Sequence, residues 1–212
     1  MRRMIHFALL ALAAAALSSC LGGKVIKYYT AGLPPAPAPA ASTLPVSLLI
    51  GHIGAPEILE DQPIAYRSGP NEIGIYEYHQ WAEPPAQMVK TLLIRQLRAS
   101  RRYQSVAQVG SSAQGEFLLA GRLYNFEEVD QNGGVSALVS MEFELVDRST
   151  RKAVWNHAYT RTTPVQGKGI PDVVAALDRS LEQGLSEVES GLDAYFSAHP
   201  HRNPEPGGTM TF

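Results

Sequence analysis

The chain has 212 residues, of which 18 are Lys or Arg and 20 are Asp or Glu, so its formal net charge is −2. A mildly acidic chain lacks the basic footprint of a nucleic-acid-binding protein, and we expect no nucleic-acid partner. Its length fits one domain with appendages. The single cysteine, Cys20, excludes a disulfide within the molecule.

The first 19 residues have the features of a cleaved secretory signal peptide. Arg2 and Arg3 supply a positive start, residues 4–17 form an apolar run made largely of Ala and Leu, and small residues follow. The run is shorter than the roughly 20 apolar residues that a membrane-spanning helix needs. Cleavage after residue 19 removes two arginines and no acidic residue, so the formal charge changes from −2 to −4.

The motif Leu17-Ser18-Ser19-Cys20 resembles the bacterial lipobox, in which the cysteine thiol is acylated with diacylglycerol and becomes the first mature residue. We therefore predict a diacylglycerol and an N-acyl lipid on Cys20, and no other cofactor. An ordinary signal peptide with a chance cysteine is the alternative. Each buried methylene adds ~0.8 kcal/mol, so several acyl chains would anchor the protein durably. Many bacteria place Asp after the cysteine to retain a lipoprotein in the inner membrane. Leu21 stands there instead, which favours the outer membrane of a two-membrane cell, with the domain facing the periplasm.

Residues 20–43 are interpreted as a linker after the lipidated cysteine. The stretch Pro34-Pro35-Ala36-Pro37-Ala38-Pro39 favours extended polyproline II. If fully extended, the roughly 23 residues of the linker would reach about 70 Å from the membrane surface. Within it, Val25-Ile26-Lys27-Tyr28-Tyr29 is too apolar for a pure spacer, and it either adds an edge strand to the domain or lies loose.

A folded domain is expected over residues 44–199, followed by a disordered tail over residues 200–212 that is rich in Pro, Gly and Asn. Alternation, β-branched residues and turn signals predict strands in the following segments: 46–53, 64–67, 73–78, 103–109, 117–129, 135–146 and 153–163. The dipeptide Asn132-Gly133 lies between the two longest segments and predicts a hairpin. In the segment 135–146, the apolar and polar side chains alternate, which predicts one buried face.

Two amphipathic helices are predicted from apolar residues at three- and four-residue steps. The first begins at Pro85 and runs for about four turns, and the second begins near Pro171 and extends to Phe196. Gly184 and Gly191 either weaken the second helix or allow it to pack closely on a sheet. The predicted fold class is α+β, with an antiparallel sheet of about five to six strands and the two main helices packed on one face.

The segment between residues 66 and 85 concentrates aromatic and charged side chains around a Ser-Gly-Pro-Asn turn. Its candidate partner-binding residues are Tyr66, Arg67, Tyr76, Tyr78, Trp81 and Glu83. One interpretation places the rings in the core, with Arg67 paired to a carboxylate at the start of the helix. The other is a recognition surface, because Tyr, Trp and Arg dominate interface hot spots.

No catalytic or metal-binding residues are predicted. Gly110-Ser111-Ser112-Ala113-Gln114 lacks the second Gly of a nucleophile elbow, and Gly167-Lys168-Gly169 lacks the spacing of a phosphate loop. His199-Pro200-His201 has no third metal ligand. Glu127 and Glu128 are adjacent on a strand, so they point to opposite faces and cannot form an acid/base pair.

With these residues in view, the chain resembles the ABC-type transport auxiliary lipoproteins, the PqiC-like family. The resemblance runs from Cys20 to the Leu-rich C-terminal helix, and its most specific part is the following series: Lys27-Tyr28-Tyr29, Ile64-Ala65-Tyr66-Arg67, Tyr76-Glu77-Tyr78 and Trp81-Ala82-Glu83-Pro84-Pro85. It implies an outer-membrane lipoprotein that works with a permease, an ATPase and an MCE-domain protein carrying lipids across the periplasm.

The function expected from this resemblance is that of a non-enzymatic adaptor. It would dock an MCE-type lipid transport assembly to the membrane that holds its acyl anchor, and it would help to maintain the outer membrane. Assembly as a homo-oligomer is compatible with this role. An alternative is a stand-alone periplasmic protein that binds lipid or a small molecule in a pocket lined by Phe143, Leu185 and Leu192. A secreted hydrolase of unfamiliar geometry is a third hypothesis.

Overall fold

The computed structural model describes residues 24–32, 40–131 and 133–200. The predicted signal peptide, Cys20 and the tail after residue 200 lie outside these ranges, as do residues 33–39 of the linker. Within them the strands are β1 (Lys27–Tyr29), β2 (Leu44–Gly54), β3 (Pro63–Gly69), β4 (Glu72–Trp81), β5 (Tyr103–Gln108), β6 (Phe117–Gln131), β7 (Gly134–Asp147) and β8 (Lys152–Pro164). The helices are a single 3-10 turn η2 (Glu57–Leu59), α2 (Pro85–Ala99) and α3 (Ile170–Ala198).

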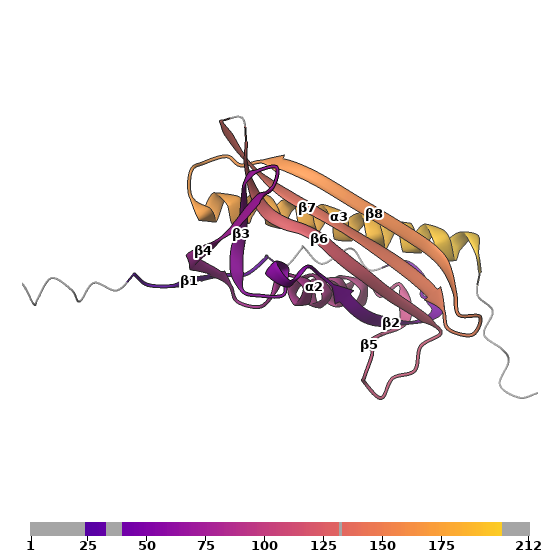
Figure 1. Cartoon of the computed structure of the whole chain (residues 1–212). Coiled ribbons are helices and arrows are strands. Elements are labelled where there is room, and N and C mark those ends of the chain that lie inside the picture. Colours follow the sequence, from indigo (N-terminus) through magenta and orange to yellow (C-terminus); the bar gives the residue numbers. More distant parts are fainter. Residues whose placement is uncertain (1–23, 33–39, 132, 201–212) are drawn as a thin grey trace, which may run out of the picture.

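All eight strands of the described residues belong to one mixed sheet organised around β6 (Figure 1). One edge of β6 pairs first with β2 and then, further along, with β3, and both pairings are parallel. Strand β5 extends the sheet beyond β2, and β4 and β1 extend it beyond β3. The other edge of β6 pairs with β7, and β7 pairs with β8. The α+β class is thus confirmed, but an entirely antiparallel sheet of five to six strands was a wrong prediction.

The antiparallel part of the sheet follows the sequence signals closely. The β3–β4, β6–β7 and β7–β8 pairs are antiparallel hairpins, each joined by a short connection. Gly133 has φ +74°, a left-handed conformation that glycine adopts without steric cost, in the turn between β6 and β7. The apolar residues of β7 from Ala137 to Leu145 are buried at alternate positions, as the pattern predicts.

Strand β1 decides between the two interpretations of the apolar stretch in the linker. Residues 27–29 pair in parallel with residues 79–81 of β4, and they form an edge strand of the sheet. The chain stays attached beyond this strand, because the Ala31 backbone is 3.2 Å from Met88 Sδ and the Gly32 N–H donates to Asp178 Oδ1 at 2.9 Å. Residues 27–32 therefore belong to the folded unit, and of the two alternatives for this stretch the structure supports the edge strand.

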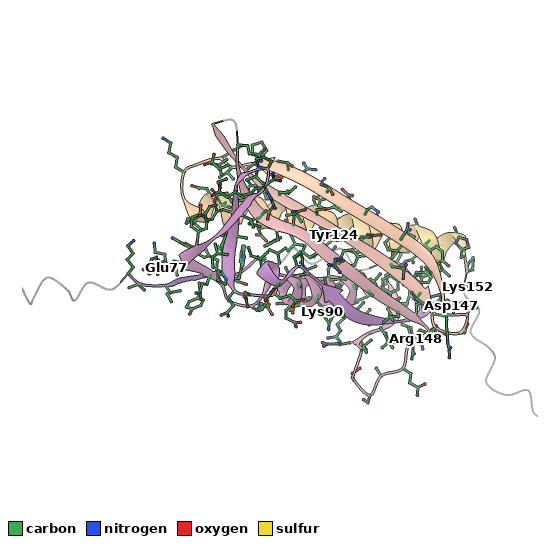
Figure 2. All side chains as sticks on the ribbon, viewed as in Figure 1. Glu77, Lys90, Tyr124, Asp147, Arg148 and Lys152 are labelled. Atoms are coloured by element: carbon green, nitrogen blue, oxygen red, sulfur yellow. The ribbon has the colours of Figure 1, made fainter. Side chains whose placement is uncertain are left out.

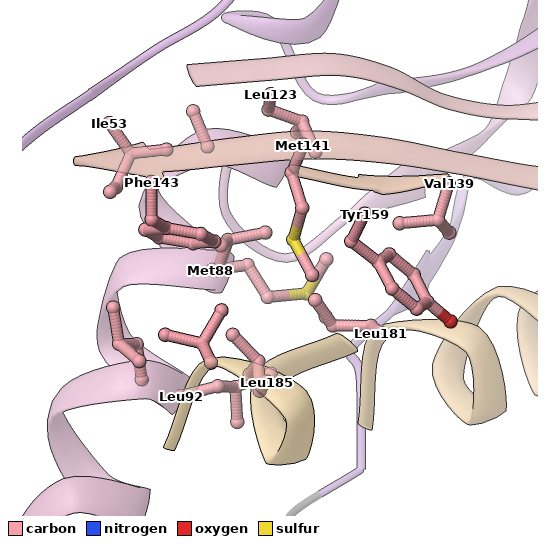
Figure 3. Packing of buried hydrophobic residues seen from close by; sticks show 14 of the residues in the cluster. Ile53, Met88, Leu92, Leu123, Val139, Met141, Phe143, Tyr159, Leu181 and Leu185 are labelled. Carbon is pink, nitrogen blue, oxygen red and sulfur yellow. The ribbon is translucent and has the colours of Figure 1, made fainter. Parts of the chain in front are cut away.

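Both helices pack on the same face of the sheet and contact each other, α2 mainly against β2 and β5 and α3 against β7 and β8. Figure 3 shows this core, in which Met88 and Leu92 of α2 and Leu185 of α3 meet Met141 and Phe143 of the sheet. Helix α2 begins with Pro85 in its first turn, where the missing N–H has no helical partner to lose.

Helix α3 uses its two glycines for close approach to the sheet. A Cβ on Gly184 would lie 2.3 Å from Met141 Cε, and a Cβ on Gly191 would lie 2.8 Å from a ring carbon of Trp155. Of the two interpretations of these glycines, close packing is the one that the structure supports. Among the described residues, no helix is both long and apolar enough to cross a bilayer.

Candidate functional site

The aromatic segment lies in the β3–β4 hairpin, which pairs with β6 through β3. Strand β3 lies between β4 and the second half of β6, with Ala65 opposite Glu127 and Tyr66 opposite Glu128. Side chains alternate across a strand, so the hairpin presents Tyr66 on the helix side and Arg67 on the opposite, outer side of the sheet. The two adjacent carboxylates of β6 are divided between these faces in the same way.

On the outer face, Arg67 forms an ion pair with Glu127. Arg67 Nε lies 2.8 Å from Glu127 Oε1, and the exposed fractions of the two side chains are 24% and 2%. Asn125 Nδ2 donates to the same carboxylate oxygen at 3.1 Å. The expectation that Arg67 pairs with a carboxylate at the helix start was therefore wrong, because the parallel β3–β6 pairing brings Glu127 beside it instead.

On the helix side, Tyr76 and Glu128 form a second polar contact between the hairpin and β6. The Tyr76 hydroxyl donates to Glu128 Oε2 at 2.9 Å, and the Tyr66 ring packs on Tyr76 with centroids 4.8 Å apart. The Tyr66 ring lies over Gly74, where a Cβ would come within 2.6 Å of it. Burial raises the pKa of Glu128, while the hydrogen bond from Tyr76 partly opposes that shift. Burial, followed by the contact with Glu128, raises the pKa of the Tyr76 phenol.

The row of rings continues from Tyr76 to the edge of the sheet. His79 meets Tyr76 edge-on with centroids 5.9 Å apart, and it stacks on Tyr29 of β1, whose hydroxyl is 2.8 Å from His79 Nδ1. Aromatic pairs of this kind add roughly 0.5–1.5 kcal/mol each beyond the area that they bury. These ring contacts therefore link β3, β4 and β1, the three strands that extend the sheet from β6.

Trp81 lies in the core. Its side chain is 1% exposed and packs against Phe126, with ring centroids 5.2 Å apart. Its indole N–H has no acceptor among the described residues, so packing alone holds the ring. Trp81 cannot contact a partner directly, and the core interpretation holds for this residue.

The solvent-facing part of the hairpin consists of other residues. Ile73 and Ile75 of β4 are 39% and 50% exposed, and they lie opposite Arg67 and Ala65 in the register of the β3–β4 pair. Tyr78 and Glu83 are partly exposed, and the Lys24 ammonium lies 5.0 Å from the centroid of the Tyr78 ring. We call Arg67, Ile73 and Ile75 the hairpin face. In the sequence this face is marked by two isoleucines at alternate positions of β4, which are neither polar nor aromatic and so are not among the predicted partner-binding residues.

The arrangement contains no nucleophile with a base. The two carboxylates lie on opposite faces of the sheet, as expected, and a Tyr76 phenol with a raised pKa is a poor base at neutral pH. In the ranges 24–32, 40–131 and 133–200, no three His, Cys, Asp or Glu side chains gather in a way that could hold a metal ion.

The proposed lipid pocket is not found at the residues assigned to it. Phe143, Leu185 and Leu192 are each 0–1% exposed and fill the core together. An open hollow of about 650 Å³ lies instead beside β8 and α3, and polar side chains including His157, Arg179 and Glu187 line it. That lining does not suit an apolar ligand.

The family of the chain follows from a comparison with known protein families. The family model described as the ABC-type transport auxiliary lipoprotein component matches residues 29–189, from the last residue of β1 into α3. The chain belongs to this family. None of the curated proteins matches it.

Solved structures show that this auxiliary lipoprotein shares its fold with other proteins. Protein XCC0632 from Xanthomonas campestris, of family DUF330, superposes with a TM-score of 0.73 at 21% identity, covering 82% of this chain and 99% of its own. A crystal structure of an uncharacterized protein superposes with a TM-score of 0.62 at 16% identity, covering 79% of this chain and 99% of its own. Both similarities concern the fold alone.

Proposed function

We propose that this auxiliary lipoprotein is a non-enzymatic adaptor of an ABC-type lipid transport system and that it helps to maintain the outer membrane. Acyl chains on Cys20 anchor it in the outer membrane, and its domain faces the periplasm and docks the MCE-domain protein of the system. The observation that carries the proposal is the family match over residues 29–189, which makes the chain an auxiliary component of transport.

The hairpin face is our candidate for the docking surface. Ile73 and Ile75 expose apolar area beside a partly exposed Arg67, and apolar residues next to an arginine are frequent in interface centres. The Arg67–Glu127 pair and the Tyr76–Glu128 contact fix the hairpin to β6, so little conformational entropy is lost when a partner binds. Tyr78 and Glu83 lie outside the hairpin face: both are only partly exposed, and the Tyr78 ring contacts Lys24.

The test is a pull-down of the acylated protein from crosslinked cells. It compares the wild type with an Ile75→Asp variant and with a Val109→Asp variant. Ile75 and Val109 are each 50% exposed, but Val109 follows β5, outside the hairpin face, so the two variants lose similar apolar surface at different sites. We expect the wild type and Val109→Asp to recover an MCE-domain protein and Ile75→Asp to recover several-fold less.

The other outcomes separate the role from the surface. Equal recovery with all three proteins would keep the adaptor role and remove the hairpin face from it. Absence of any transport component from the wild-type sample would contradict the adaptor role. Circular dichroism of each variant shows whether it is folded, which distinguishes a loss of binding from a loss of fold.

A further inference from the structure

The chain between the predicted anchor and the folded domain is short. Four residue steps separate Cys20 from Lys24, and seven separate it from the start of β1 at Lys27. An extended chain spans at most ~3.6 Å per residue, so Lys24 lies within about 14 Å of Cys20 and Lys27 within about 25 Å. The first described residues must therefore remain close to the acyl chains.

Residues 27–32 cannot detach to lengthen this connection without losing fixed contacts. Residues 27–29 pair with β4, and the Ala82 N–H donates to the Tyr29 carbonyl at 2.7 Å. Ala31 is buried, and the Gly32 N–H is held by Asp178 of α3. Because the strand is fixed to the sheet, the end of the domain that carries β1 is held close to the membrane.

The side chains at this end have the composition of a membrane–water interface. Val25 is 79% exposed, Ile26 41% and Tyr28 60%, so three large apolar or aromatic side chains face solvent within four consecutive residues. Lys24 and Lys27 are exposed beside them. Tyr side chains favour the headgroup level of a bilayer, and Lys can bury its stem while its ammonium reaches the headgroups.

We propose that residues 24–28, the anchor-proximal patch, lie against the phospholipid surface that holds the acyl chains of Cys20. The inference rests on acylation of Cys20, which is part of the proposed function. Retention is supplied by the acyl chains, since one chain alone binds marginally and several bind durably. The patch instead sets the orientation of the domain, with β1 and the adjacent end of β4 toward the lipid.

The hairpin face lies outside the anchor-proximal patch. Ile75 lies three residues before Tyr78, whose ring contacts Lys24, which corresponds to about 10 Å along an extended strand. The opposite end of the sheet carries Asp147, Arg148 and Lys152, and Figure 2 shows this group far from Glu77 at the β1 end. The connection between β5 and β6 also lies at the end away from β1 (Figure 1).

The test uses acylated full-length protein with one added cysteine, since Cys20 is the only native cysteine and acylation blocks its thiol. Tyr28→Cys and Val25→Cys place an environment-sensitive NBD label on the patch, and Val109→Cys places it at the far end as the matched control. The proteins are reconstituted into phosphatidylethanolamine and phosphatidylglycerol vesicles. Some of these vesicles contain lipids with a nitroxide on the headgroup.

We expect the two patch labels to shift to shorter wavelength and to be quenched several-fold more by nitroxide lipids than the Val109 label. Iodide in the water should quench the Val109 label most. If the chain floats with the vesicles but its patch labels respond like the Val109 label, this inference is wrong and the anchor stands. Patch labels that are protected from iodide without nitroxide quenching would also overturn it, since a protein would then cover the patch. A chain that carries no acyl mass and does not float overturns the anchor and the inference together.

Discussion

The Arg67–Glu127 pair allows the stability of the candidate docking hairpin to be tested by a double-mutant cycle. Arg67→Met removes the guanidinium and keeps an apolar stem, so the variant isolates the charge from the packing. Glu127 then keeps a carboxylate whose side chain is 2% exposed, with Asn125 as its remaining polar partner. The perturbation therefore creates a buried and incompletely paired charge.

The size of the effect follows from this burial. Removing one partner of a buried ion pair costs about 3–5 kcal/mol, whereas an exposed pair contributes about 0–1 kcal/mol. Arg67 is 24% exposed and Asn125 stays in place, so we expect Arg67→Met to lose about 3 kcal/mol. A domain with the usual stability of about 5–15 kcal/mol stays folded after this loss.

The second arm of the cycle removes the buried charge as well. Replacing both partners by apolar residues is often nearly neutral, so Arg67→Met combined with Glu127→Leu should recover to within about 1 kcal/mol of the wild type. Urea unfolding followed by circular dichroism gives the free energy of unfolding for each variant. Arg95→Met, at an exposed position of α2, is the control and should change stability by less than about 0.5 kcal/mol.

Two results would refute the reasoning. A loss of less than about 1 kcal/mol in Arg67→Met would mean that the pair behaves as an exposed one and that water reaches Glu127. A double variant that is less stable than Arg67→Met alone would mean that Glu127 is stabilised by contacts other than Arg67.

Two further predictions concern the packing of α3 and the second carboxylate of β6. Gly184→Ala places a Cβ 2.3 Å from Met141 Cε, and an overpacking cost of about 1–3 kcal/mol should outweigh the helix-propensity gain of about 1 kcal/mol. Urea unfolding should show a net loss in the free energy of unfolding of Gly184→Ala. The control Ser186→Ala, on the exposed side of α3, should be neutral or slightly stabilising. A Gly184→Ala variant more stable than the wild type would contradict the close packing. Burial raises the pKa of Glu128 above its unfolded value, so its favourable contribution is complete below about pH 4.5 and is lost as the pH rises through its folded pKa. Glu128→Gln keeps an acceptor for Tyr76 but cannot ionise. The free energy of unfolding of this variant relative to the wild type should therefore increase between pH 4 and pH 7. A constant difference in a pH series of urea titrations would rule this out.

The sequence by itself determined the local elements and the faces that they bury. The periodicity of α2 and α3 and the alternation in β7 predict which side chains enter the core, since helical and extended backbones impose fixed side-chain periods. The Asn-Gly dipeptide predicts the β6–β7 hairpin, because its backbone requirement is local. The aromatic series before α2 also carries the family resemblance that the match over residues 29–189 confirms.

Only the tertiary structure decided which strands are neighbours. Backbone hydrogen bonds are the same for every sequence, so an alternating pattern shows which face is buried without showing that β6 pairs with β2 and then β3. Those parallel pairings place Glu127 beside Arg67 and Glu128 beside Tyr76, contacts that span about 50 to 60 residues of chain. They also leave Ile73 and Ile75 exposed, bury Trp81, and give β1 an edge on which to pair. The proposed position of the domain relative to its anchor thus depends on long-range pairing that no local pattern encodes.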